Sequence, residues 1–219
     1  MNKLYLDIET LPADEEKRQI LELIFKHQLE KKSKKREASE EVEIDGKDSD
    51  KFEDYFRSTS LDGAFGRVLC IGYAVNNDDT RIIYDPDILE RKTLEEFWQV
   101  ASKCELFIGH NIMDFDLKFL YQRSIVVGVK PTKDLSFARY RSNPIFDTMK
   151  EWSKWDSNKK NIGLEHIALA LGITTPKDGI DGSQVYDFHK QGKDKEICDY
   201  CMRDVEATRL VYKKMIFEP

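Results

Sequence analysis

The sequence predicts an α/β protein with a mixed five-stranded sheet flanked by helices, and three observations carry this prediction. An alternating segment, 3–9, and a continuous apolar segment, 67–75, are typical of strands. After residue 93, short apolar strands alternate with amphipathic helices, which is the order of an α/β fold. An apolar fraction of 40% in 219 residues is enough for one hydrophobic core.

The first strand is the most informative element. Alternation in KLYLDIE places Leu4, Leu6 and Ile8 on one face. Asp7 and Glu9 then share the opposite face. Further strands are predicted at 67–75, 80–85, 105–109 and 126–129 (VVGV). Helices are predicted at 93–103 with Thr93 as its cap, at 114–123, at 162–171 with Gly172 at its end, and at 194–216.

Residues 13–60 interrupt this pattern. A charged helix over 14–36 is followed by 37–54, which carries nine acids and two bases. We therefore expect a single domain over 1–219 with a charged insertion at about 13–60. The insertion could cover a substrate, hold a partner, or be a solvated flap without a catalytic role.

Composition excludes several classes of protein. The net charge of −6 argues against a generic nucleic-acid coat protein. It does not exclude an enzyme that binds phosphate through metal ions. The sequence contains no run of about 18 apolar residues, so it predicts no membrane-spanning helix. The N-terminus has no apolar signal core, and four cysteines are no disulfide framework in a chain of this length. A cytoplasmic protein is the expectation.

Three acidic segments are candidates for chemistry. Asp7 and Glu9 point to one side of an apolar strand, which is costly unless a cation compensates; an edge strand facing water is the plain alternative. In the segment GHNIMDFD, Asp116 falls in the first turn of a helix, and Asp114 is better placed as the helix cap. Asp147, in FDTM, is also expected to cap a helix.

The third segment is YCMRD on the terminal helix. Tyr200 and Asp204 are four residues apart and share one helical face, so their polar atoms can converge. The alternative is a core aromatic beside a surface acid.

Together these segments resemble the DEDD (DnaQ-like) superfamily of 3′→5′ exonucleases, which have a ribonuclease-H-like fold. The family's first motif matches LDIET, its second matches N-IMD-FD and its third matches YCMRD. Asp199 stands where the histidine subclass requires His, so the chain resembles the tyrosine subclass. The closest likeness is to predicted exonucleases related to the proofreading domain of B-family DNA polymerases. It covers about 1–12 and 62–216.

The resemblance implies a site for two divalent cations. Asp7 would bridge both ions, Glu9 and Asp204 would complete the site of the ion that binds the attacking water, and Asp116 would serve the other ion. Oxygen ligands without histidine favour Mg²⁺ or Mn²⁺. Tyr200, with an ordinary pKa of about 10, would orient the water rather than act as a base.

Substrate contacts are less specific. Leu11 and Phe115 could wedge or stack the terminal nucleotide, and Asn111 could hold the loop or touch the substrate. The segment 130–160 has eight Lys/Arg against four acids with interleaved aromatic side chains. It is a candidate strand-tracking surface, and a solvated loop pinned by core aromatics is the alternative.

The expected function is therefore 3′→5′ exonuclease cleavage of single-stranded DNA, with a separate replication or repair partner in any proofreading role. RNA 3′-end trimming and a non-catalytic nucleic-acid-binding module are the alternatives. A thiol or zinc protein built on Cys198 and Cys201 is a third. That reading lacks a second ligand pair, because Cys70 and Cys104 are isolated in the sequence.

Overall fold

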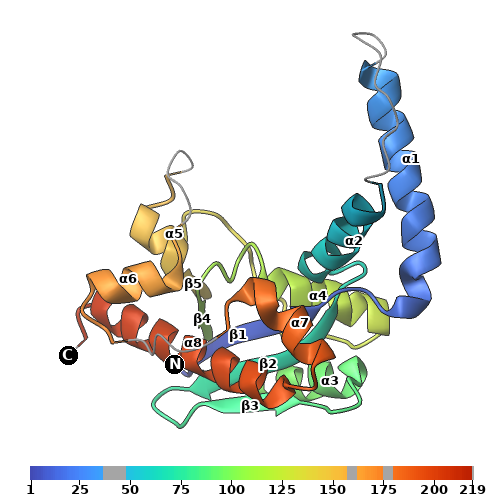
Figure 1. The fold of residues 1–219 in the computed structure, drawn as a ribbon. Helices are drawn as coiled ribbons and strands as arrows, with labels where there is room; N and C mark the ends of the chain where they lie inside the picture. The colour runs from blue at the N-terminus through green and yellow to red at the C-terminus, as the bar shows by residue number, and fades with distance from the viewer. Residues whose placement is uncertain (37–47, 157–161, 175–179, 219) are drawn as a thin grey trace.

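The computed structural model describes residues 1–36, 48–156, 162–174 and 180–218, and one five-stranded sheet forms its centre (Figure 1). The strands are β1 (Lys3–Leu11), β2 (Arg67–Val75), β3 (Arg81–Tyr84), β4 (Leu106–Gly109) and β5 (Ile145–Asp147). Their order is β3-β2-β1-β4-β5. β2 runs antiparallel to β1 and β3, whereas β4 runs parallel to β1 and β5. The predicted mixed five-stranded α/β sheet is confirmed.

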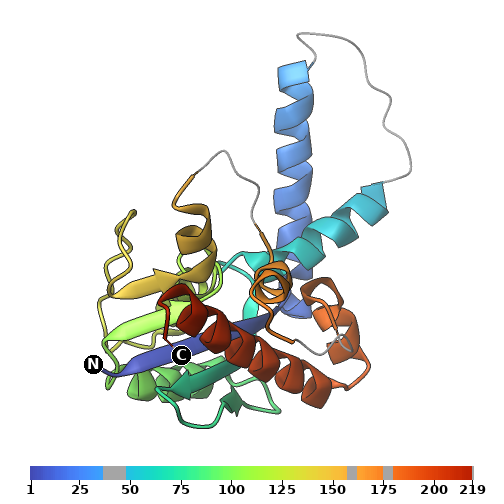
Figure 2. The same ribbon diagram turned by 90° about the vertical axis from the view of Figure 1, so that its left-hand side faces the viewer.

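Helices cover both faces of the sheet (Figure 2). The helices outside the 13–60 segment are α3 (Glu90–Ala101), α4 (Asp116–Val127), α5 (Thr148–Ser153), α6 (Leu164–Ala170), α7 (Val185–Lys190) and α8 (Asp194–Met215). On one face, Leu4, Leu6 and Ile8 pack in the core with side chains of α3 and α4. On the other face, Tyr5 packs against Val205 and Tyr212 of α8. Strand β1 therefore presents its acidic side to α8.

Two helices project from the sheet between β1 and β2 (Figure 1). They are α1 (Arg18–Arg36) and α2 (Asp48–Ser58), and they pack against each other near the sheet. The base of the pair is anchored, because Leu21 and Phe56 are fully buried together. Arg57 also forms an ion pair with Asp187 of α7 at 2.8 Å. The acidic stretch predicted over 37–54 lies partly outside the described residues.

The fifth strand is not where the sequence placed it. The segment 126–129 was predicted as a strand from its valines, but α4 continues through Val127 and ends at Gly128, which has a φ of +70°. The core side chains of the preceding helix outweigh the local preference of two valines. The fifth strand is instead β5, which has only three residues and pairs with β4.

The predicted cap at Thr93 is also wrong. Helix α3 starts three residues earlier, at Glu90, and Thr93 is buried inside it. A tertiary contact accounts for this start, because the buried Glu90 carboxylate binds Arg123 at 2.6 Å and the Val68 amide at 3.0 Å. By contrast, the predicted Gly172 position after α6 is confirmed by a φ of +70°. None of the helices in the described ranges is long and apolar enough to cross a membrane.

Candidate active site

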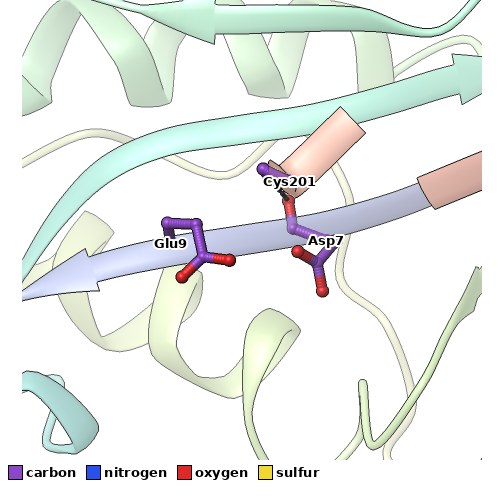
Figure 3. Close-up of side chains that lie close together, drawn as sticks. All are labelled: Asp7, Glu9 and Cys201. Carbon is purple, nitrogen blue, oxygen red and sulfur yellow. Dashed lines mark hydrogen bonds between the residues drawn. The ribbon is translucent and has the colours of Figure 1, made fainter. Parts of the chain in front are cut away.

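Asp7 and Glu9 share one side of β1, as the alternation predicted, and this side faces α8. A carboxylate oxygen of Asp7, one of Glu9 and the Sγ of Cys201 all lie within 4.8 Å of one another (Figure 3). The Cys201 thiol donates to the Asp7 carbonyl at 3.4 Å and accepts from the Gly72 amide at 3.2 Å. A Cβ added to Gly72 would lie 2.9 Å from that sulfur. Glycine at this position therefore lets α8 approach the central strands closely.

Asp116 reaches the same place from α4. Its Oδ1 accepts a hydrogen bond at 3.1 Å from the amide of Ile8, the residue between Asp7 and Glu9. The side chain is buried, with 3% of its surface exposed. Burial is the main reason that its pKa rises to about 7, and the charges of Asp147 and Asp204 add to the effect.

Asp204 completes the cluster from α8, one turn after Tyr200. Burial raises its pKa to about 6, while Tyr200 and Arg203 favour its charged form. The same environment raises the pKa of the Tyr200 phenol, first through burial and then through the charges of Asp204 and Glu9. The predicted convergence of these two side chains is what the structure shows, and Tyr200 is half-buried beside the carboxylates rather than in a remote core position.

The charges of the four acids act on one another. The pKa of Asp7 is raised well above its ordinary value, mainly by burial, and also by Cys201, Asp116 and Glu9. The pKa of Glu9 is raised in the same way, by burial and then by Asp204. Four carboxylates that repel one another in a buried position are strongly stabilised when a cation lies among them.

Asp147 contributes more than the helix cap predicted for it. The cap is confirmed, because its Oδ1 accepts from the amides of Met149 and Lys150 at the start of α5. The same carboxylate also accepts from Asn111 at 3.1 Å and from Met113 at 3.2 Å. It thereby holds the loop that leads into Asp116. The FDTM motif predicted the cap, but nothing in the sequence indicated the contact with this loop.

Asp114, by contrast, does not cap α4. The residue before the helix is Phe115, and it makes no side-chain cap. Asp114 is exposed and forms an ion pair with Lys150 at 2.6 Å. The loop turns three residues earlier at Asn111, which has a left-handed φ of +60°.

The predicted substrate contacts separate into two kinds. Leu11 is fully buried with Leu69, Val185 and Ile197, so its side chain offers no surface to a nucleotide. Phe115 is half-buried at the start of α4, next to Asp116. Its ring packs against Phe119, with centroids 5.6 Å apart, and keeps part of its surface exposed.

His110 has a structural environment. Its Nε2 donates to the Ile162 carbonyl at 2.9 Å, and its Nδ1 lies 3.0 Å from the Thr148 hydroxyl. Burial lowers its pKa to about 4, so the ring is neutral near pH 7. It connects the loop after β4 to α5 and to the segment before α6.

The cysteines of the C-x-x-C motif are both buried. Cys70 of β2, which is isolated in the sequence, lies beside both Cys198 and Cys201 in the structure. The three sulfurs are not all within 4.8 Å of one another, and among the described residues only Asp7, Glu9 and Cys201 form a group of that kind. This arrangement favours small core side chains that pack α8 on the sheet.

A family model matches residues 58–218, and its description is a predicted 3′-5′ exonuclease related to the exonuclease domain of PolB. The chain belongs to this PolB-related exonuclease family. The matched range includes Asp116, Tyr200 and Asp204 and leaves out Asp7 and Glu9. The strand that carries those two residues is separated from the matched range by α1 and most of α2.

One solved structure has a fold similar to that of this chain. It is the family B DNA polymerase from the hyperthermophilic archaeon Pyrobaculum calidifontis, with a TM-score of 0.63 and 14% sequence identity. The alignment covers 99% of this chain and 24% of the polymerase chain. The fold is therefore the ribonuclease-H-like fold of such an exonuclease domain. No curated protein matches the chain.

Proposed function

We propose that the chain hydrolyses phosphodiester bonds at the 3′ end of nucleic acid, with single-stranded DNA as its substrate, using two divalent cations. The observation that supports this most is a set of four acids from three elements whose charges act on one another in a partly buried place. They are Asp7, Glu9, Asp116 and Asp204. Membership of an exonuclease family agrees with this chemistry.

The donor set suits Mg²⁺ or Mn²⁺, because carboxylate oxygens are the ligands these ions prefer. Asp7 would help to hold both ions. Glu9 and Asp204 would complete the position nearer to Tyr200, and Asp116 would serve the second. When bound, the two ions would activate the attacking water and neutralise charge on the phosphate oxygens.

Tyr200 would orient the attacking water. Its raised pKa keeps the phenol protonated at neutral pH, so it is a poor general base. A protonated hydroxyl beside Asp204 can still accept or donate a hydrogen bond and so fix the position of a water molecule. Tyr200 is thus a positioning group, and deprotonation of water depends on the cations.

The terminal nucleotide would lie against the start of α4. There Phe115 offers a half-buried ring next to Asp116, and Asn111 holds the loop that turns into the helix. In a proofreading role the chain would act beside a separate replication or repair partner. A non-catalytic module of the same fold is disfavoured, because none of the four acids has been lost.

The test uses 5′-labelled single- and double-stranded DNA and RNA of one sequence, each with Mg²⁺, Mn²⁺ or EDTA. We expect single-stranded DNA to shorten stepwise from its 3′ end only when a divalent ion is present. Preferential shortening of the RNA would instead support 3′-end trimming of RNA.

The control for this assay is a pair of charge-matched variants. Asp7→Asn should abolish cleavage, whereas Asp114→Asn, at an exposed carboxylate bound to Lys150, should retain it. Failure of the wild-type protein to shorten any of the four substrates with either ion would refute the proposal. Equal cleavage by Asp7→Asn would show that another nuclease is responsible.

A further inference from the structure

The segment 136–143, with the sequence SFARYRSN, leads into β5 and exposes large aromatic side chains. Phe137 is 39% exposed and Tyr140 is 73% exposed. Monomeric proteins usually bury rings of this size, so their exposure on one short segment calls for a partner. The Phe137 ring also contacts Tyr121, with centroids 5.7 Å apart, and Tyr121 packs against the core. The segment is therefore anchored by aromatic contacts, as one interpretation of 130–160 expects, and still exposes part of both rings.

Positive charge lies on the same segment. Arg139 and Arg141 flank Tyr140, and both side chains are exposed. Within the part of the chain that the structure describes, neither guanidinium forms an ion pair or a hydrogen bond. The sequence contains no acid between Asp134 and Asp147. In a chain with a net charge of −6, this is a local positive surface that lacks a negative partner.

Helix α5 continues the same surface. The rings of Tyr140 and Trp155 lie 5.5 Å apart, which joins the segment to the end of α5. Trp152 of α5 is 41% exposed. Figure 2 shows the segment and α5 next to each other on the β5 side of the sheet. We call Phe137, Arg139, Tyr140, Arg141 and Trp152 the aromatic–arginine surface.

This surface is connected directly to the candidate active site. Helix α5 begins just after Asp147, whose carboxylate holds the loop before Asp116. Lys150 of the same helix binds Asp114 in that loop. The helix has six residues and is thus about 9 Å long. A strand whose 3′ end lies at the acidic cluster would reach the surface within a few nucleotides.

We propose that the aromatic–arginine surface binds the single strand upstream of the terminal nucleotide, an inference that rests on the proposed function of the acidic cluster. The exposed rings stack on bases, as every base has a flat face and stacking needs no specific sequence. The two arginines contact phosphates, which supply the negative charge that the protein does not. A second copy of the chain fits less well, because each copy would bring the same positive charge to the contact.

The test measures binding without cleavage. Fluorescence anisotropy in EDTA follows a labelled oligothymidylate of roughly 12 nucleotides, within the usual range of single-strand sites. We expect Arg139→Glu combined with Arg141→Glu to weaken binding about tenfold or more and to reduce the salt slope by about 0.7 for each lost contact. Tyr140→Ala should weaken binding about fivefold or more.

Arg81→Glu is the control for a single charge reversal, and it is compared with Arg139→Glu and Arg141→Glu made one at a time. Arg81 is exposed on β3, at the opposite edge of the sheet from β5. The Arg81→Glu variant should therefore bind the oligothymidylate as tightly as the wild type does. In cleavage assays, the KM for the long strand divided by the KM for a dinucleotide should rise in the surface variants and stay constant in Arg81→Glu. Thermal melts check that each variant is folded.

The outcomes separate this inference from the function on which it rests. Binding that is unchanged in the surface variants, or weakened equally by Arg81→Glu, overturns the inference even if 3′ cleavage occurs. Binding that depends on these residues in a protein that cleaves nothing supports the surface and refutes the proposed function. Loss of self-association in Tyr140→Ala, with binding unchanged, would identify a contact between copies and overturn the inference.

Discussion

Asp116 accepts a hydrogen bond from the backbone amide of Ile8, at 3.1 Å. This contact fixes the first turn of α4 to the middle of β1, between the two acids of that strand. The position of Asp116 is therefore set by the strand backbone and exists before any cation binds. Because these carboxylates are held together in advance, the chain without metal carries a repulsion that divalent ions would relieve.

Asp7→Asn should remove cleavage while leaving the protein folded. It removes one of the clustered negative charges at nearly constant shape, so we expect cleavage to fall on the order of a hundredfold or more. In EDTA near neutral pH, the melting temperature should rise by about 2–4 °C, the shift that roughly 1 kcal/mol gives in a chain of this size. Differential scanning fluorimetry with parallel cleavage assays measures both effects.

The response to metal provides the control for Asp7→Asn. The wild-type melting temperature should rise with Mn²⁺, and this rise should shrink in the variant because a ligand is missing. Asp87→Asn, at an exposed acid in the turn before α3, should keep the full rise. A variant that melts lower than the wild type in EDTA would identify Asp7 as a structural carboxylate.

Stability without metal should fall as the pH rises. The pKa of Asp204 is about 6 and that of Asp116 about 7 in the folded chain, against an ordinary value of 3.8 for both. A raised folded-state pKa contributes stability that is complete below the ordinary value and is lost as the pH passes through 6 to 7. Melting temperatures in EDTA should therefore decrease from about pH 5 to about pH 8.

Metal binding should show the opposite trend over the same pH window. Cations bind the deprotonated acids, so Mn²⁺ affinity and cleavage should increase as the pH rises through this range. The Asp116→Asn variant has no titrating group at position 116. Its melting temperature in EDTA should therefore depend less on pH than that of the wild type. An equal pH dependence in the variant and the wild type would show that another group titrates.

Tyr200→Phe should lower turnover without unfolding the protein. The variant keeps the ring and loses only the hydroxyl, so we expect kcat to fall about ten- to a hundredfold, which is less than the loss of a strong general base can cost. KM should change little, since the hydroxyl is assigned to the water. Single-turnover cleavage of labelled DNA measures the step.

Tyr84→Phe is the control for Tyr200→Phe. The hydroxyl of Tyr84, the last residue of β3, donates to Asp194 at the start of α8. This variant therefore removes the same phenol oxygen at a contact with α8 that lies outside the cluster of Asp7, Glu9, Asp116 and Asp204. Its turnover should match that of the wild type. Unchanged turnover in Tyr200→Phe would remove Tyr200 from the mechanism.

Asp147→Asn should weaken both the fold and the metal site. The amide keeps one acceptor for Asn111 and the start of α5, but its NH₂ group cannot accept from Met113. We expect a loss of about 1–3 kcal/mol in the free energy of unfolding, because a buried donor is left without a partner. Urea unfolding measures this loss.

A Mn²⁺ titration distinguishes a positioning role of Asp147 from a purely structural one. If Asp147 positions Asp116 through the loop, the affinity for Mn²⁺ falls in Asp147→Asn. Asp114→Asn, on the same loop but exposed, should change neither quantity. A Mn²⁺ affinity equal to that of the wild type would reduce Asp147 to a helix cap.

Sequence patterns predicted the structure correctly where the geometry of a single strand or helix determines it. The alternation of β1 correctly predicted that Asp7 and Glu9 share a face, because successive side chains of a strand point to opposite sides. Helical spacing likewise placed Tyr200 and Asp204 on one face of α8. The position of Gly172 was predictable because only the left-handed backbone after a helix favours glycine so strongly.

Local pattern failed where contacts across the fold outweigh propensity. Val126 and Val127 favour a strand in isolation, but the helix that begins at Asp116 continues through them. Strand β5 has three residues, too few for a periodic signal, and exists only because β4 offers it an edge. Glu90 starts α3 because Arg123 lies opposite it in the fold.

The sequence by itself therefore determined the fold class, the acidic face of the first strand and the pairing of a tyrosine with an acid on the last helix. These features depend on the geometry of single elements. Only the tertiary structure decided that Asp147 holds the loop before Asp116, that Leu11 is sealed in the core, and that Cys201 packs beneath Asp7. Such contacts join residues far apart in the chain, so they depend on how strands and helices pack together.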